Sequence, residues 1–226
     1  MELNPYVNIH THHVGEGINV LDVGEGKAWV DEERMRVLNE GQDVFYSVGI
    51  HPMKVGAVSE NALAGIEDTI KIEKVIAIGE CGLDRRSPVS IGEQERVLEA
   101  QVKLAEEFRK PLIIHCVKAY SELIAIRKKT KSTVPWIIHG FNNNEQILRQ
   151  LLDNGFYISM GTALLNEQSH AYHLIRQIPA STLFLENDDR EIEIGVIYKA
   201  ASGIIGLTAE ELKNVMLDNY KKIFAI

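Results

Sequence analysis

The stretch from Val75 to Glu80 reads VIAIGE, an apolar run that ends in a carboxylate. Four more segments follow the same pattern, in which a strand-like run ends in a histidine or an acid: 7–12 (VNIHTH), 112–115 (LIIH), 136–139 (WIIH) and 183–188 (LFLEND). Continuous apolar runs are typical of parallel strands buried on both faces. Parallel barrel strands bring their C-terminal ends to one face, and histidines and carboxylates are metal ligands. The pattern therefore predicts a metallohydrolase site on a barrel.

Strand-like and helix-like stretches alternate along the chain. We expect eight strands, at 6–12, 18–24, 44–50, 75–80, 111–115, 135–140, 156–160 and 183–187. We expect helices between most of them, at 31–40, 59–72, 91–109, 119–130, 143–153, 166–177 and 190–202, and a last helix at 208–224. Ser90 with Glu93 and Thr208 with Glu211 are typical capping boxes. This alternation predicts an α/β fold of the (β/α)8 TIM-barrel type.

The first crossover is the exception to this alternation. Only the four residues VGEG, at 14–17, separate the first strand from the run at 18–23. Because this is too short for a helix, either the first crossover helix is missing or the second run is not a barrel strand. We expect a shortened barrel without this helix. We also expect a single domain over residues 1–226, because no internal repeat or linker divides the chain.

The composition is that of an ordinary globular protein. The chain has 226 residues, of which 45% are hydrophobic, and its formal net charge is -8. This charge argues against a general basic surface for nucleic acid, although bound divalent cations would attract phosphate. No export signal, membrane span or obligate protein partner is evident, so a cytoplasmic location is predicted. The two cysteines, Cys81 and Cys116, are therefore expected to be reduced.

The histidines of the first strand are spaced for metal binding. His10 and His12 are two residues apart, so both side chains lie on one face of a strand and one ion can take both imidazoles. His13 is expected to point the other way.

Glu80 and two further histidines end three buried strands. An isolated buried charge is very costly, so Glu80 must be paired, protonated or bound to a metal. The alternative to a metal is a salt bridge to Arg85, Arg86 or Lys118. His115 and His139 end two other strands in the same way, and three such strands together favour metal binding.

Asp188 ends the last strand. Its carboxylate is expected to complete a site with the first-strand histidines or to act as a base on bound water. Asp189 and Glu186 are the alternatives, because the alternation of side chains breaks down at a frayed strand end.

The whole set is too large for one catalytic ion, which usually has three protein ligands and an open position. The expected metal ligands are His10, His12, Glu80, His115, His139 and Asp188. Two divalent ions would use all of them if Glu80 bridged the ions: His10, His12, Glu80 and Asp188 would hold one ion, and Glu80, His115 and His139 would hold the other. Mixed imidazole and carboxylate ligands suit Zn, Mn, Fe or Ni, whereas Mg is less comfortable with histidine.

A series of motifs runs nearly from end to end of the chain. They are HTH at 10–12, SVGIHP at 47–52, AIGECGLD at 77–84, PLIIHC at 111–116, IHGF at 138–141, GFYISMG at 155–161, LEND at 185–188 and the closing Asn219. This ordered series resembles the TatD family of metal-dependent deoxyribonucleases in the amidohydrolase superfamily. The resemblance implies a TIM-type barrel, the two-ion ligand set and phosphodiester hydrolysis. It also implies that His51 lies beside the site and contacts a substrate phosphate.

Several positions depart from the family pattern: Asn8, Met53, Val117, Asn142 to Asn144 and Asn187. Asn8 and Asn187 replace an aspartate and a threonine beside metal ligands. Met53 and Val117 replace a histidine and an arginine, so two potential phosphate contacts are missing. The three asparagines replace a loop of the Ser-Gly-Ser type. The expected metal ligands are therefore all present, whereas several of the substrate-binding residues expected around them are replaced.

The resulting hypothesis is a phosphodiesterase or deoxyribonuclease acting on single-stranded DNA or another phosphoester. A water activated by two metal ions would attack phosphorus, and Asp188 would orient or deprotonate that water. His51 would steady the phosphate, helped by Lys118 or Arg85. One alternative is an amidohydrolase-type enzyme acting on a small amide, lactone or phosphate ester, which the acidic charge and Val117 favour. Another is a non-catalytic relic that binds metal for stability.

Overall fold

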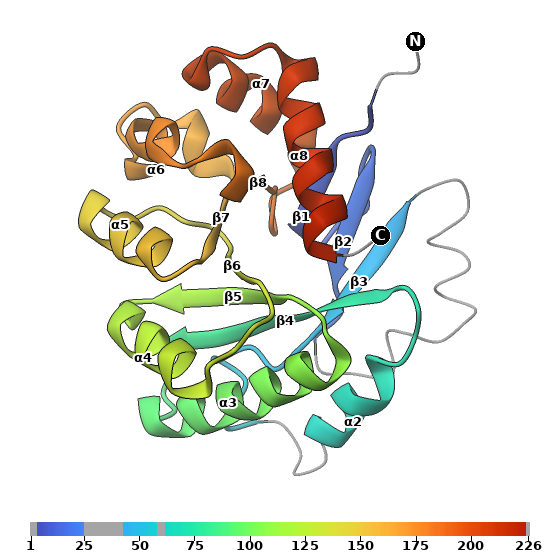
Figure 1. The fold of residues 1–226 in the computed structure, drawn as a ribbon, viewed down its shortest axis with the longest axis vertical. Coiled ribbons are helices and arrows are strands. Elements are labelled where there is room, and N and C mark those ends of the chain that lie inside the picture. The colour runs from blue at the N-terminus through green and yellow to red at the C-terminus, as the bar shows by residue number, and fades with distance from the viewer. Residues whose placement is uncertain (1–3, 25–42, 58–61, 225–226) are drawn as a thin grey trace. The chain divides into compact units, whose positions relative to one another are not determined.

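The strands of the molecule follow the predicted order in the computed structural model, which describes residues 4–24, 43–57 and 62–224 (Figure 1). Eight strands lie in these residues: β1 (Val7–Thr11), β2 (Ile18–Asp22), β3 (Val44–Val48), β4 (Val75–Asp84), β5 (Leu112–Val117), β6 (Trp136–Ile138), β7 (Tyr157–Met160) and β8 (Leu183–Leu185). In the sheet they are neighbours in chain order. Each predicted strand is confirmed, and β4 extends four residues beyond its predicted end.

Helices follow most of the strands. They are α2 (Ala62–Thr69), α3 (Ile91–Phe108), α4 (Tyr120–Thr130), α5 (Glu145–Asp153), α6 (His170–Leu174), α7 (Ile194–Ile205) and α8 (Ala209–Phe224), with 3-10 turns η2 (Thr162–Leu165), η3 (Ile175–Gln177) and η4 (Ala180–Thr182). Both capping boxes are confirmed, because the N-cap oxygens of Ser90 and Thr208 accept hydrogen bonds from the backbone three residues later. The predicted helix at 31–40 and the start of the one at 59–72 lie outside the described residues.

Two helices differ from their predicted ranges. α6 has five residues, because the segment before it forms a turn in which Ser169 N donates to Asn166 O and the Ser169 side chain caps Tyr172 N. α7 runs from Ile194 to Ile205 rather than from 190 to 202. The Asn187 side chain donates to Ile192 O at 2.9 Å and so holds the preceding segment outside the helix.

The strand pairing is that of an α/β barrel. The pairs β1–β2, β3–β4, β4–β5 and β7–β8 are all parallel. A parallel bridge between Thr11 and Asp188 joins the end of β1 to the residues that follow β8. Pairing of the first and last strands is the closure that a barrel requires. The predicted (β/α)8 fold is therefore confirmed.

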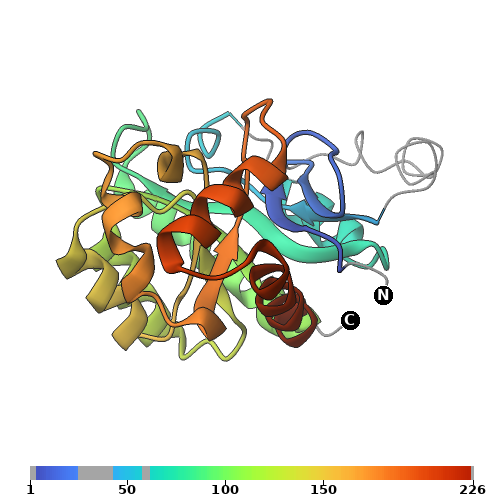
Figure 2. The same ribbon diagram turned by 90° about the horizontal axis from the view of Figure 1, so that it is seen from above.

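The described residues form two compact units: the first contains residues 4–21, 43–44 and 138–224, and the second contains residues 22–24, 45–57 and 62–137. In the first unit, α8 packs against β1 and β8, and α7 lies beside α8 (Figure 1, Figure 2). In the second unit, α3 packs against β4, and α4 packs against β5. The metal-type residues are distributed over both units.

The first crossover contains no helix, as predicted, yet β2 is a true strand that pairs with β1. The connection at 12–17 is held in place by Asn19, whose side chain donates to Gly15 O and Gly17 O at 2.8 and 2.9 Å. Gly17 has φ +89°, and a Cβ on it would lie 2.4 Å from Tyr6 O. A side chain at this position would therefore collide with the backbone, which explains the glycine.

Two buried glutamines of α3 fix backbone beside the expected site residues. Gln94 Oε1 accepts from Asp84 N at 2.8 Å, and Gln101 Oε1 accepts from Ile50 N at 2.7 Å. Each side-chain amide also donates back to the carbonyl of the same residue. The strand end at Asp84 and the segment before His51 are therefore clamped by paired hydrogen bonds.

Two strands bulge at an expected metal ligand. In β1, Ile9 and His10 together oppose one residue of β2, between the pairs Asn8–Asn19 and Thr11–Leu21. In β4, residues 79 and 80 together oppose Ile113 of β5, between the pairs at 78 and 81. A bulge of this kind changes the direction in which a side chain points.

Cys81 and Cys116 are buried free thiols, as expected for reduced cysteines. Burial raises the pKa of both thiols, to about 12 for Cys116. Neither therefore has the depressed pKa of a reactive cysteine. Across the described ranges, every helix is too short or too polar to span a membrane.

Candidate metal centre

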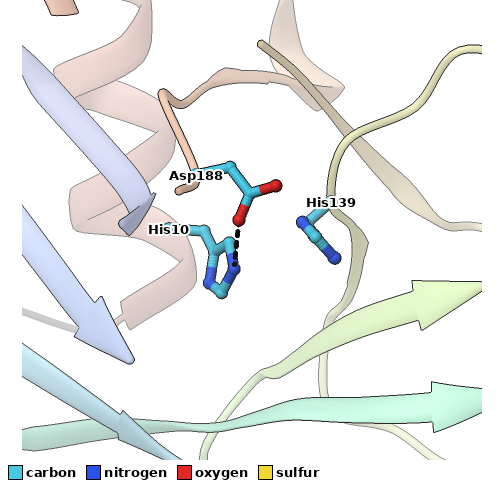
Figure 3. Close-up of side chains that lie close together, drawn as sticks. All are labelled: His10, His139 and Asp188. Carbon is cyan, nitrogen blue, oxygen red and sulfur yellow. Dashed lines mark ion pairs between the residues drawn. The ribbon is translucent and has the colours of Figure 1, made fainter. Parts of the chain in front are cut away.

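The first unit gathers four of the predicted residues, which we call the first cluster: His10, His12, His139 and Asp188. One ligand-type atom from each of His10, His139 and Asp188 lies within 4.8 Å of the others. His10 Nε2 is 3.3 Å from Asp188 Oδ1, and His12 Nε2 is 3.6 Å from the same oxygen. Figure 3 shows the His10 and His139 rings on either side of the Asp188 carboxylate.

The backbone of Asp188 is fixed by β1 on both sides. Asp188 N donates to His10 O at 3.2 Å, and Asp188 O accepts from His12 N at 3.1 Å. Asp188 has φ +53°, which few non-glycine residues adopt. Its side chain is 38% exposed, whereas that of His10 is fully buried. The carboxylate therefore meets the buried imidazole on one side and solvent on the other.

His139 is oriented by a buried carboxylate, Glu186. Glu186 Oε1 lies 3.2 Å from His139 Nδ1 and accepts from Gly140 N at 2.7 Å. A carboxylate only accepts, so Nδ1 carries the proton in this contact and Nε2 is left as the ligating nitrogen. Glu186 Oε2 is buried without a hydrogen-bond partner.

Two of the departures from the family pattern contact each other. Asn8 Nδ2 donates to Asn187 Oδ1 at 2.9 Å, and Asn187 N donates to Asn8 Oδ1 at 3.3 Å. Both residues are buried. The pair links β1 to the segment that carries Asp188, so the two substitutions are complementary.

The second unit gathers His51, Glu80 and His115, which we call the second cluster. Glu80 Oε1 lies 2.7 Å from His115 Nδ1 and 3.1 Å from His51 Nε2. Asp22 Oδ1 accepts from Glu80 N at 2.9 Å and so fixes the Glu80 backbone. Gly82 keeps β4 close to His115, since a Cβ there would lie 1.9 Å from His115 O.

His115 is oriented by a second buried carboxylate, Asp84. His115 Nε2 lies 3.0 Å from Asp84 Oδ2, which leaves Nδ1 for a metal. Arg86 donates to Asp84 through its backbone N at 2.8 Å, Nε at 3.0 Å and Nη2 at 2.7 Å. Burial alone would raise the pKa of Asp84, but the hydrogen bonds from Arg86 and His115 hold it well below its usual value.

Several residues expected near the substrate have structural partners. Arg85 pairs with Glu122. The Asn144 side chain caps α5 by accepting from Ile147 N, and Asn142 Oδ1 accepts from Ala171 N of α6. The Met53 side chain is exposed, while its backbone N donates to His51 Nδ1 at 3.1 Å. Asp189 pairs with the neighbouring Arg190.

The orienting roles of Asp84 and Glu186 were missed by the sequence analysis. Asp84 lies inside the AIGECGLD motif, four residues after Glu80, and could have been suspected because a fully buried acid needs a partner. Glu186 was considered only as a substitute for Asp188. Its contact with His139 spans 47 residues of sequence, and no local pattern indicates it.

The donor atoms of each cluster fit a divalent metal. Each combines imidazole nitrogens with a carboxylate oxygen. The ligand atoms of His10, His139 and Asp188 lie within 4.8 Å of one another, as do those of His51, Glu80 and His115. This mixed set suits zinc and similar transition metals. In each cluster, a carboxylate behind one histidine fixes which nitrogen faces the site, which is the usual outer-sphere arrangement of metal-binding histidines.

Comparison with known proteins gives a consistent result. A family model described as TatD related DNase matches residues 7–225. YabD of Bacillus subtilis (strain 168), named a metal-dependent hydrolase, is 29% identical over 210 residues, which are 85% of this chain and 82% of that protein. The 3'-5' ssDNA/RNA exonuclease TatD of Edwardsiella piscicida is 33% identical over 146 residues, which are 63% of this chain and 56% of that protein.

Solved structures share the fold. The TatD homologue YJJV of Escherichia coli K12 has a TM-score of 0.77 and 21% identity, with 92% of this chain and 86% of that chain covered. A TatD family hydrolase of Entamoeba histolytica has a TM-score of 0.78 and 16% identity, with 99% of each chain covered.

Proposed function

Because the chain belongs to the TatD-related DNase family and is a metal-dependent hydrolase of that family, we propose that it hydrolyses phosphodiester bonds in single-stranded DNA or RNA. The name of the Edwardsiella piscicida relative, an ssDNA/RNA exonuclease, supports the substrate class. The observation that carries the proposal is the pair of clusters, each of which combines histidines and a carboxylate with a buried acid behind one histidine. The proposal treats residues 1–226 as one catalytic domain.

The metal ligands in the proposal are the six predicted from the sequence, with His139 moved from the second ion to the first. His139 joins the first ion because its ligand atom lies within 4.8 Å of those of His10 and Asp188. His10, His12, His139 and Asp188 serve one divalent ion, and Glu80 with His115 serves the other. The bridging role of Glu80 between the two ions remains a prediction from the sequence. Bound divalent ions would supply Lewis-acid activation of water and of the phosphate. The ligand types are compatible with Zn, Mn, Fe or Ni.

The remaining chemistry belongs to side chains of the chain itself. Asp188 has a fixed backbone and a half-exposed carboxylate, so it is suited to orient the attacking water and to accept its proton. The Met53 backbone N donates to one ring nitrogen of His51. The other ring nitrogen lies 3.1 Å from Glu80 Oε1, and there it would steady a phosphate oxygen. Arg85 is engaged with Glu122, so a role for it on phosphate would require that pair to open.

The first experiment is the variant Glu80→Ala. Loss of this carboxylate removes an oxygen ligand of the second cluster, so hydrolysis of single-stranded DNA should become undetectable while the circular dichroism spectrum stays native. Metal analysis of the purified proteins should show fewer bound ions in the variant. Glu107→Ala, an exposed acid on α3 of the same unit, is the control and should retain full activity. Full activity in Glu80→Ala would contradict the two-metal model.

A substrate comparison separates this function from the small-molecule alternative. Digestion of single strands labelled at the 3′ end should release products in the presence of divalent metal, faster than a panel of small amides, lactones and phosphate monoesters is hydrolysed. Turnover of the small compounds without cleavage of DNA or RNA would favour the amidohydrolase-type alternative. No turnover with any added ion would favour the non-catalytic relic.

A further inference from the structure

A large groove lies on the first unit, separate from the first cluster. Its volume is about 720 Å³, and it is lined by η2, α6, η3 and α7. This volume falls within the range typical of binding sites for small molecules or short segments of a polymer. The groove is open to solvent rather than enclosed, as binding of a polymer requires.

The charged residues that line the groove are mostly basic, although the chain as a whole is acidic. Arg176, Lys199 and His173 line it with a single acid, Glu167, whereas the whole chain has a net charge of -8. Arg176 Nε donates to Ile204 O, so the main chain of α7 holds the guanidinium against the wall. A fixed guanidinium beside a lysine is suited to phosphate, which it can bind through several hydrogen bonds.

Other residues that line the groove are apolar or aromatic. Three large hydrophobic side chains are exposed among the described residues, and two of them, Leu165 and Val196, line this groove with 43% and 44% exposure. Tyr172 also lines it, and its ring makes an edge contact with the His173 ring at a centroid distance of 5.6 Å. Apolar and aromatic surfaces beside fixed cations are the features on which proteins bind single strands, by stacking bases and pairing phosphates.

The elements that line the groove lie close in the chain to the segments that carry the first cluster, or are hydrogen-bonded to them. η2 starts directly after β7, where a Cβ on Gly161 would lie 3.2 Å from Glu186 O. The loop after His139 is tied to α6 through Asn142 and Ala171 N. α7 begins six residues after Asp188. The elements that line the groove and the segments that carry the first cluster therefore adjoin each other within the same unit.

We propose that this groove is an accessory site for single-stranded nucleic acid, in which Arg176 and Lys199 bind phosphates and Tyr172 with Leu165 and Val196 supports bases. This inference rests on the proposed function for the identity of the polymer. A second copy of the chain is a poorer occupant, since two exposed apolar side chains are few for a stable protein interface.

The test is oligonucleotide binding without catalysis. In the presence of a chelator, fluorescence anisotropy measures the affinity for a labelled oligothymidylate of about 12 nucleotides. The double variant Arg176→Glu/Lys199→Glu should bind it about tenfold more weakly or worse, because two phosphate contacts become repulsive. The control Lys221→Glu/Lys222→Glu makes the same charge change on α8 of the same unit and should bind as the wild type does.

Two further variants guard against misfolding and charge effects. Lys199→Glu alone leaves the Arg176 bond to Ile204 O intact and should still weaken binding severalfold. Tyr172→Ala changes no charge and should weaken binding through lost stacking, by about tenfold. Unchanged binding in all groove variants overturns the proposal, as does an equal loss in the α8 control. Self-association of the wild type in sedimentation, abolished by the groove variants, also overturns it in favour of a second copy.

A small substrate keeps this test apart from that of the proposed function. Bis(para-nitrophenyl) phosphate has a single phosphodiester and no further nucleotides to occupy the groove, so the groove variants should hydrolyse it at the wild-type rate when metal is present. If the wild type hydrolyses neither this ester nor DNA, the proposed function fails, and the anisotropy result still decides whether the groove binds single strands. If hydrolysis is normal and the groove variants bind DNA normally, the groove proposal alone fails.

Discussion

His115 and His139 are each oriented by a buried carboxylate, but the two carboxylates differ in the groups that surround their charge. Asp84, behind His115, receives hydrogen bonds from the backbone N, Nε and Nη2 of Arg86 and a contact from His115, so its charge is compensated inside the protein. Glu186, behind His139, is equally buried, but its hydrogen bonds come from Gly140 N and His139, and Oε2 has no hydrogen-bond partner among the described residues. A buried carboxylate without a compensating cation is costly. The second unit thus pairs its buried acid with an arginine, whereas the hydrogen bonds to Glu186 within the described residues include none from an arginine or lysine.

The largest effect that this comparison predicts is for Asp84→Ala. The variant removes the carboxylate that lies 3.0 Å from His115 Nε2 and takes away the ion-pair partner of the Arg86 guanidinium. Metal affinity of the second cluster should fall by about 10- to 100-fold, and the unfolding free energy of the metal-free protein by about 1–3 kcal/mol. Competition with a chromophoric chelator and urea unfolding measure the two quantities. Asp153→Ala, an exposed acid on α5, is the control. Unchanged affinity would show that Asp84 does not orient His115.

Glu186→Gln should raise the unfolding free energy of the metal-free protein, whereas Asp84→Ala should lower it. The glutamine oxygen can still accept from Gly140 N and His139, while the uncompensated charge disappears. The metal-free variant should therefore gain about 1 kcal/mol in unfolding free energy, and its metal affinity should fall by about tenfold. Thermal unfolding with and without chelator checks both effects. A loss of stability in the metal-free variant would contradict the contrast between the two units.

Arg86→Ala should have the smallest effect. The guanidinium is 61% exposed, so its ion pair with Asp84 contributes less than about 1 kcal/mol. Asp84 keeps its bonds to Arg86 N and His115, but its pKa should rise towards the usual value because the guanidinium is gone. Metal affinity should fall about threefold or less. Titration of the Asp84 carboxyl by NMR, compared with the wild type, measures the rise, and no rise would show that the Arg86 side chain is dispensable.

The strand pattern allowed most of the fold to be predicted from the sequence. Long apolar runs that end in His or Glu have few alternatives to parallel barrel strands, and the short VGEG connection pointed to the missing helix. The structure adds the reason that this connection works, which is the bonding of Asn19 to Gly15 and Gly17. The shortening of α6 was not predicted, because the turn that precedes it depends on one side-chain cap at Ser169.

The residues of the candidate site that lie at strand ends could be predicted from the sequence. Contacts between residues far apart in the sequence could not. His10, His139 and Asp188 come from three strand ends and lie together in the first unit. The Asn8–Asn187 pair joins residues 179 positions apart, so the sequence shows two unrelated departures where the structure shows one complementary contact. The bulges could not be predicted from the hydrophobic pattern either, because one extra residue does not change the apolar character of a strand.

These bulges have a consequence for how such a site can change. At His10 and at Glu80, the extra residue lets the ligand side chain point in a direction that the pairing of the preceding strand residues does not determine. Deleting one residue at either place would turn the ligand away and leave the core residues upstream in register. Insertions and deletions of single residues, rather than substitutions, are therefore the mutations that can redirect a ligand in this barrel without rebuilding its core. The same operation offers protein engineers a means of moving a metal site while keeping its scaffold.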